Sequence, residues 1–152
     1  MNGLIEWVDP KTLRANPANP NIHSPEQIKR LAKLITHYGW RHPIILSKQS
    51  GLVVVGHGRL LAALKMGTAT VPVHAQDFET PDQEYGFMVS DNAVASWAEL
   101  DMAQINIEVP SLGPDFDLEL LGFKEFKLDL CEDAESKKKK QIRTCPHCGG
   151  SL

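Results

Sequence analysis

Residues 52–67 read LVVVGHGRLLAALKMG, which is an apolar run, a glycine-rich turn and a second apolar run. The first run, at 52–55, is short and rich in β-branched residues, which favours a buried strand. The second, at 60–66, consists mainly of strong helix formers and is followed by Gly67, which favours a buried helix with a glycine cap. We therefore predict a strand that turns directly into a helix at 56–59.

The flanking sequence predicts the rest of a mixed α/β domain. Short apolar runs typical of strands occupy 5–8, 43–46 and 71–73. Because the last run contains a proline, it is either an edge strand or a strand with the proline at its beginning. Residues 43–55 have the pattern of a β-hairpin. Residues 24–27 and 80–83 each combine an N-cap, a proline at the first helical position and a capping-box glutamine. Each opens a helix, and the second helix has an apolar face of Tyr85, Met88, Val89 and Ala93.

Composition divides the chain into three parts. We expect a domain at 1–98, a helical extension at 99–130 with helical pieces near 102–107 and 118–121, and a charged linker with a Cys-x-x-Cys tail at 131–152. At 152 residues the chain is long enough for one sizeable core.

Charge and hydropathy exclude several classes of protein. Lysine and arginine number 16 against 19 acidic residues, so the net charge of −3 gives no general attraction for nucleic acid or anionic membranes. No apolar run approaches the roughly 20 residues that span a bilayer, and the N-terminus lacks a signal-peptide layout. Three cysteines are too few for a disulfide framework. These features predict a soluble cytoplasmic protein with no membrane partner.

The glycine turn has the chemistry of a phosphate site. The first N–H groups of a helix are unpaired, and Gly56 and Gly58 let the backbone approach an anion closely. Arg59 adds a charge-assisted contact, and His57 adds a donor whose charge changes near neutral pH. Local sequence alone supports equally well a plain strand-to-helix connection.

A wider set of residues carries a resemblance to a known family. The matching residues are Gly39 with Pro43-Ile44, Val55 to Arg59, Ala62-Ala63 with Met66-Gly67, Val71 to Val73, Asp91-Asn92 and Leu121 to Phe123. In this order and register the chain resembles the ParB/sulfiredoxin superfamily, most closely the phage-type and DNA-methylase-associated ParB-like N-terminal domains. The resemblance implies a compact α/β (α+β) fold with a small mixed sheet and flanking helices.

The resemblance also implies nucleoside triphosphate binding, with CTP in partition ParB proteins and ATP in sulfiredoxins. Gly56, His57, Gly58 and Arg59 would then hold the phosphates. Asp91-Asn92 falls where partition ParB proteins carry a Glu-Asn pair near the triphosphate and its Mg²⁺, which implies a catalytic role for Asp91 beside His57; the alternative is a polar helix end. His42 lies where the family often has a pocket glutamine, so His42 and its neighbour Arg41 are nucleotide-binding candidates, each alternatively a surface side chain.

Departures from the family pattern narrow the function. His57 stands where sulfiredoxins carry their catalytic cysteine, which excludes sulfinic-acid reduction. Partition ParB proteins have Glu-Arg-Arg after the glycine, so His57-Gly58-Arg59 lacks one arginine. Val94 and Ala95 replace a glutamine and an arginine, and no helix-turn-helix pattern follows. A partition-type DNA clamp is not expected.

The tail, Cys145-Pro146-His147-Cys148-Gly149-Gly150, has the form of a zinc knuckle. Cys145 and Cys148 supply two ligands and Cys131 a third, with no evident fourth. We expect a partial or intermolecular Zn²⁺ site; the alternative is a surface turn that binds no metal. The lysine run at 137–140 either contacts a nucleic-acid backbone or, as its acidic neighbours favour, is a solvated linker.

Three functions follow from these observations. The first is a nucleotide-binding domain, hydrolysing the nucleotide or transferring its phosphoryl group, in phage or mobile-element DNA metabolism. The second is a non-enzymatic adaptor that binds DNA or a DNA-modification enzyme such as a methyltransferase, through the zinc tail. The third is a nuclease, for which no convincing carboxylate cluster accompanies Asp91, Glu84 lying one face away. Each of the three functions is compatible with a homodimer.

Overall fold

The structure is a computed structural model that describes residues 4–124 of the 152. The described residues form two units: 4–100 together with 117–124, and 101–116. Among residues 4–124, no helix combines the length and the apolar character needed to cross a membrane.

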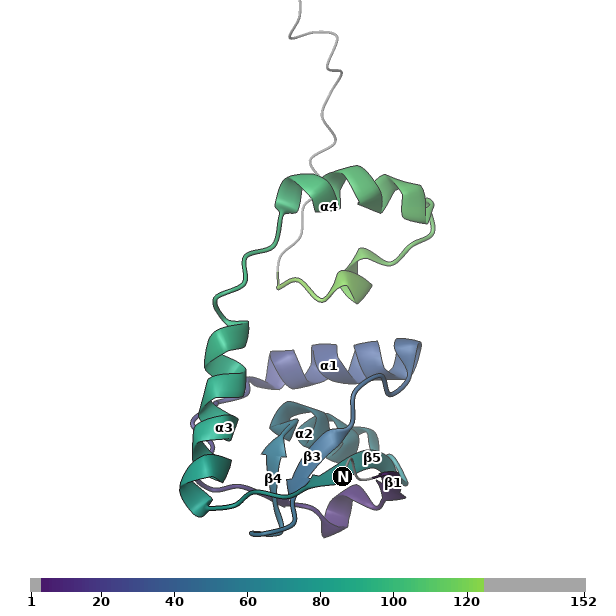
Figure 1. Cartoon of the computed structure of the whole chain (residues 1–152). Helices are drawn as coiled ribbons and strands as arrows, with labels where there is room; N and C mark the ends of the chain where they lie inside the picture. The colour runs from purple at the N-terminus through teal and green to yellow at the C-terminus, as the bar shows by residue number, and fades with distance from the viewer. Residues whose placement is uncertain (1–3, 125–152) are drawn as a thin grey trace, which may run out of the picture. The chain divides into compact units, whose positions relative to one another are not determined.

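The first unit is built on a five-stranded mixed sheet (Figure 1). The strands are β1 (Ile5–Val8), β2 (Arg14–Ala15), β3 (Ile44–Ser47), β4 (Leu52–Val55) and β5 (Val71–Gln76), in the order β1-β5-β3-β4-β2. β3 and β4 pair antiparallel, which confirms the predicted hairpin. β5 is an inner strand rather than an edge. Pro72 fits there because it lies near the strand's beginning, one residue before the pairing with β3 starts at Val73.

The same unit contains three helices, α1 (Pro25–Tyr38), α2 (His57–Met66) and α3 (Pro81–Ala95). The predicted caps are confirmed, because the Ser24 and Thr80 hydroxyls accept the N–H groups of Gln27 and Gln83, both at 3.1 Å. α2 contacts both α1 and β3, and α3 contacts β4. Short 3₁₀ turns, η1 (Pro10–Thr12) and η3 (Leu118–Leu121), complete the unit.

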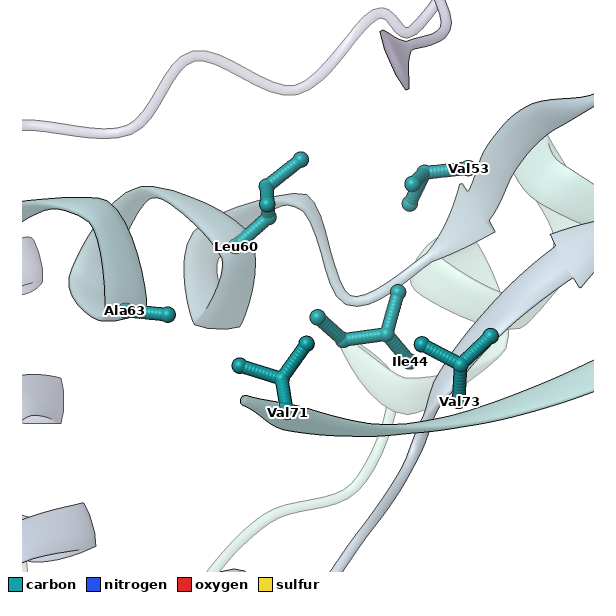
Figure 2. Packing of buried hydrophobic residues seen from close by; sticks show 6 residues of the cluster. All are labelled: Ile44, Val53, Leu60, Ala63, Val71 and Val73. Atoms are coloured by element: carbon teal, nitrogen blue, oxygen red, sulfur yellow. The ribbon is translucent and has the colours of Figure 1, made fainter. Parts of the chain in front are cut away.

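The hydrophobic core lies between α2 and the sheet. Its buried members are Ile44, Val53, Leu60, Ala63, Val71 and Val73. Figure 2 shows Leu60 and Ala63 coming from the helix and the other four from the strands. Burying one such aliphatic side chain stabilises the fold by about 1.5–3 kcal/mol. This packing fixes the end of β4 against the start of α2, where the glycine turn lies.

The buried face of α3 differs from the predicted one. Tyr85 is 51% exposed, whereas Glu84 and Met88 are buried. The Glu84 carboxylate accepts hydrogen bonds from the Ser47 hydroxyl at 2.6 Å and from the Ser50 hydroxyl at 2.8 Å. A buried carboxylate is tolerated when such donors satisfy it, so the polar residue rather than the aromatic one faces the sheet.

The second unit contains α4 (Met102–Glu108) and the 3₁₀ turn η2 (Val109–Leu112). Asp101 caps α4 by accepting the N–H of Gln104 at 3.0 Å. The predicted helical piece near 102–107 is thus α4. The piece at 118–121 forms as η3, which belongs to the first unit.

Candidate functional site

The turn from β4 to α2 has the predicted strand-turn-helix geometry. Gly56 is the N-cap of α2 at φ +95° and ψ +26°, a left-handed conformation that favours glycine. A side chain there would also approach the Cα and Cγ1 atoms of Ile44 at 3.4 Å. No side chain caps this helix, and the Gly56 carbonyl accepts its first backbone bond from Leu60 at 2.9 Å. The first N–H groups of α2 are therefore open to an anion.

A cavity of about 220 Å³ lies at this turn. It is lined by Asn21, His23, Leu31, Val55, Gly56, His57, Gly58, Arg59, Asp91 and Asn92. Six of the residues singled out from the sequence thus meet around one space: Gly56, His57, Gly58, Arg59, Asp91 and Asn92. They come from the N-cap and first turn of α2 and from α3, and these helices contact β3 and β4 respectively.

The Arg59 guanidinium interacts with a backbone carbonyl and with a nearby carboxylate. Its Nη1 donates to the Pro43 carbonyl at 3.4 Å. Burial lowers the pKa of the guanidinium, and the nearby Asp91 carboxylate partly offsets this. Arginine keeps its charge in proteins, so the cavity contains a fixed cation beside a carboxylate.

His57 is a neutral imidazole with a defined tautomer. It is buried, and its Nε2 accepts the backbone N–H of Asn16 at 3.2 Å. A backbone N–H can only donate, so the ring proton lies on Nδ1. Burial, and secondarily the neighbouring His23, lower the pKa of His57. His57 therefore offers the site a neutral N–H donor rather than a positive charge.

Asp91 and Asn92 lie near the end of α3 and contribute differently. Asn92 uses its amide nitrogen to donate to the Met88 carbonyl at 2.8 Å. Asp91 is the carboxylate in the cavity lining. Within residues 4–124, no group of three or more His, Cys, Asp and Glu side chains is placed to hold a metal ion. A single carboxylate nevertheless suits Mg²⁺, which takes one or two carboxylates and completes its shell with phosphate oxygens and water.

Arg41 and His42 lie at a second, neighbouring cavity of about 180 Å³. Its other lining residues are Leu31, Leu34, Ile35, Tyr38, Gly39, Trp40 and Arg59. Leu31 and Arg59 line both cavities. The structure thus places Arg41 and His42 next to the glycine turn rather than at it.

A polar network behind the turn escaped the sequence analysis. Glu84 binds Ser47 and Ser50, and the Asn16 side chain approaches it at 3.5 Å, while the Asn16 backbone binds His57. These partners are separated by 34 to 68 residues along the chain, so no local spacing signals them. His23 also lines the cavity and is absent from the site residues predicted from the sequence.

The three cysteines of the predicted zinc site, Cys131, Cys145 and Cys148, lie outside the described residues, so that site stays a prediction.

Comparison with known proteins finds a relative by sequence and several solved structures of similar fold, two of which follow. The chain is 33% identical over 66 residues to the ParB-like nuclease domain-containing protein YnaK of Escherichia coli K12, a match covering 43% of this chain and 75% of that protein. No family model matches the chain.

The first structure is the C-terminally truncated chromosome-partitioning protein ParB of Caulobacter crescentus, complexed with CTP-gamma-S. It has a TM-score of 0.62 at 22% identity, and the match covers 72% of this chain. The second is a Pnob8-like ParB-N domain, with a TM-score of 0.50 at 21% identity over 60% of this chain. The matches span 63% and 38% of those two chains, and at these identities they establish a shared fold.

Proposed function

This chain belongs to the ParB-like domain family of the ParB/sulfiredoxin superfamily, and on that basis we propose that its glycine turn binds a nucleoside triphosphate, CTP or ATP, together with Mg²⁺. The observation that carries the proposal is the meeting of an uncapped helix N-terminus, Arg59 and Asp91 around one cavity. The solved ParB relative with the same fold is complexed with a CTP analogue.

The phosphates are assigned to the turn itself. Backbone N–H groups at the start of α2 and the Arg59 guanidinium are complementary to phosphate oxygens. The neutral Nδ1–H of His57 is a further donor. Asp91, with Asn92 beside it, is the assigned contact for the Mg²⁺, whose role would be to neutralise phosphate charge.

The rest of the nucleotide is assigned to the second cavity. Arg59 lines both cavities, so a ligand whose phosphates lie against the glycine turn can extend past Arg59 toward Arg41 and His42. Trp40 and Tyr38 line the same cavity and provide aromatic surface for a base or sugar.

Nucleotide hydrolysis or phosphoryl transfer is the chemistry that this arrangement would support. Catalysis of such reactions rests on positioning and on stabilising charge, which are the roles given to Arg59, His57 and Asp91. We place the activity in phage or mobile-element DNA metabolism, in the cytoplasm of a bacterium or infected host. DNA, a DNA-modification enzyme and a second copy of the chain are the further partners to test.

Calorimetry with CTP, ATP and GTP in the presence of Mg²⁺ tests the proposal. The wild type should bind one of them, and Arg59→Ala should abolish that binding. Arg14→Ala, which removes an exposed arginine on β2 that lines neither cavity, should bind normally. Phosphate release in the same samples separates a binding module from an enzyme. Absence of binding to all three nucleotides would overturn the proposal and favour the adaptor function.

A further inference from the structure

We propose that His23 is a phosphate-binding residue of this site and supplies, as an imidazolium, the second positive charge that the glycine turn lacks. The inference deepens the proposed nucleotide-binding function and rests on it. His23 precedes α1 by two residues and reaches the cavity from a part of the chain distinct from α2 and α3.

The position of the ring is set by Gly58. A Cβ atom at Gly58 would lie 3.3 Å from Cε1 of His23 and 3.4 Å from its Nδ1. The imidazole therefore lies directly over the glycine turn, where the open N–H groups of α2 are found. Gly58 is itself buried, and the absence of a side chain there lets the ring come this close.

A hydrogen bond to Gln27 fixes the orientation of the ring. Nδ1 of His23 lies 3.1 Å from Oε1 of Gln27. Since a carboxamide oxygen only accepts, Nδ1 is the donor in this pair. Gln27 was predicted to close a capping box on Ser24, but its side chain binds His23 instead. Nε2 of His23 has no hydrogen-bond partner among residues 4–124, so it is available to a ligand.

Among the side chains that line the cavity, His23 is the one that can add a second positive charge to that of Arg59. Four ionisable residues line it: His23 before α1, His57 and Arg59 on α2, and Asp91 on α3. The positive charge of Arg59 and the negative charge of Asp91 sum to zero. His57 stays neutral because its Nε2 accepts the Asn16 N–H. Protonation of His23 would therefore give the cavity a net positive charge and turn Nε2 into a charged donor to phosphate.

Calorimetry at pH 8.0 and pH 6.5 tests the inference, with inorganic tripolyphosphate and the Mg²⁺-nucleotide that binds best as probes. The wild type should bind more tightly at pH 6.5 than at pH 8.0. His23→Gln, which keeps a polar side chain without the charge, should lose about tenfold in affinity at pH 6.5, the size of a charge-assisted hydrogen bond. The ratio of its affinity at pH 6.5 to its affinity at pH 8.0 should also be smaller than that of the wild type. Titration of the probe affects both proteins equally, so it cancels when the two ratios are compared.

His37→Gln is the matched control, because His37 is an exposed residue of α1 that lines neither cavity. It should behave as the wild type, and unfolding midpoints should show that both variants remain folded. If His23→Gln retains wild-type affinity and pH dependence while Arg59→Ala loses binding, the role of His23 is wrong and the nucleotide site stands. If the wild type binds neither probe at either pH, both proposals fall.

Discussion

At the scale of single residues, His57 shows how a neighbour defines a group's chemistry. Its Nε2 accepts the Asn16 N–H and the ring is buried, which lowers the pKa of His57 below the ordinary value of 6.5. In the unfolded chain the same imidazole takes up a proton as the pH falls through 6.5. The fold resists that protonation, so acid should destabilise it in this window.

The free energy of unfolding should therefore fall as the pH drops below 6.5, until the pH reaches the lowered pKa of folded His57. His57→Gln should flatten that slope, because it removes the group whose proton uptake differs between the two states. Urea unfolding at intervals from pH 7.5 to 5.0 measures the slope. His37→Gln, at an exposed position, is the comparison. Equal slopes for His57→Gln and the wild type would contradict the assignment.

At the scale of secondary-structure elements, α3 is joined to the β3–β4 hairpin by a buried carboxylate. Glu84 in the first turn of α3 is 5% exposed and accepts from Ser47 on β3 and from Ser50 in the turn that follows. The Ser47 hydroxyl also accepts the N–H groups of Gln49 and Ser50, at 3.1 and 3.2 Å. One cluster therefore holds the turn of the hairpin against the helix that carries Asp91.

Glu84→Ala should lower the free energy of unfolding by about 1–3 kcal/mol, because it leaves the buried Ser47 hydroxyl and the half-buried Ser50 hydroxyl without their acceptor. Asp82→Ala removes an exposed carboxylate from the same turn of α3, so its effect should stay within about 0.5 kcal/mol. Urea unfolding of both variants measures the difference. Similar losses for the two would mean that helix-end charge, rather than the hydrogen bonds, accounts for the effect of Glu84.

At the scale of the whole molecule, the chain leaves the first unit after Leu100 and rejoins it at Asp117. A cluster of polar contacts holds the returning segment to α1. Lys33 forms ion pairs with Asp117 at 2.6 Å and with Glu119, and the Tyr38 hydroxyl donates to the Leu120 carbonyl at 3.4 Å. Hydrogen bonds from Lys33 lower the pKa of both carboxyl groups and raise that of Lys33.

Lys33→Met should increase amide hydrogen exchange at 117–121 while leaving exchange in the sheet unchanged. Lys29→Met, on the same helix and exposed, should change neither. Because the carboxyl pKa values are lowered, the contribution of the ion pairs is present above the ordinary carboxyl pKa and is lost as acid protonates Asp117 and Glu119. The wild type should thus approach the exchange of Lys33→Met only below about pH 4. Unchanged exchange in Lys33→Met at neutral pH would show that apolar packing alone holds the segment.

Local signals in the sequence were enough to locate most elements of this protein. Proline and an N-cap mark the starts of α1 and α3, and the change of hydrophobic spacing around Gly56 marks the turn from β4 to α2. Such signals are readable because they involve residues within about four positions of one another. The resemblance carried by residues spread from 39 to 123 added the superfamily.

Long-range packing determined what those signals could not indicate. The strand order put β5 inside the sheet, and hydrogen bonds to two serines let Glu84 replace Tyr85 on the buried face of α3. The backbone of Asn16 set the tautomer of His57, and the absence of a side chain at Gly58 brought His23 over the glycine turn. Each of these depends on contacts between residues 29 or more positions apart, which follow from the assembled core and from no periodicity along the chain.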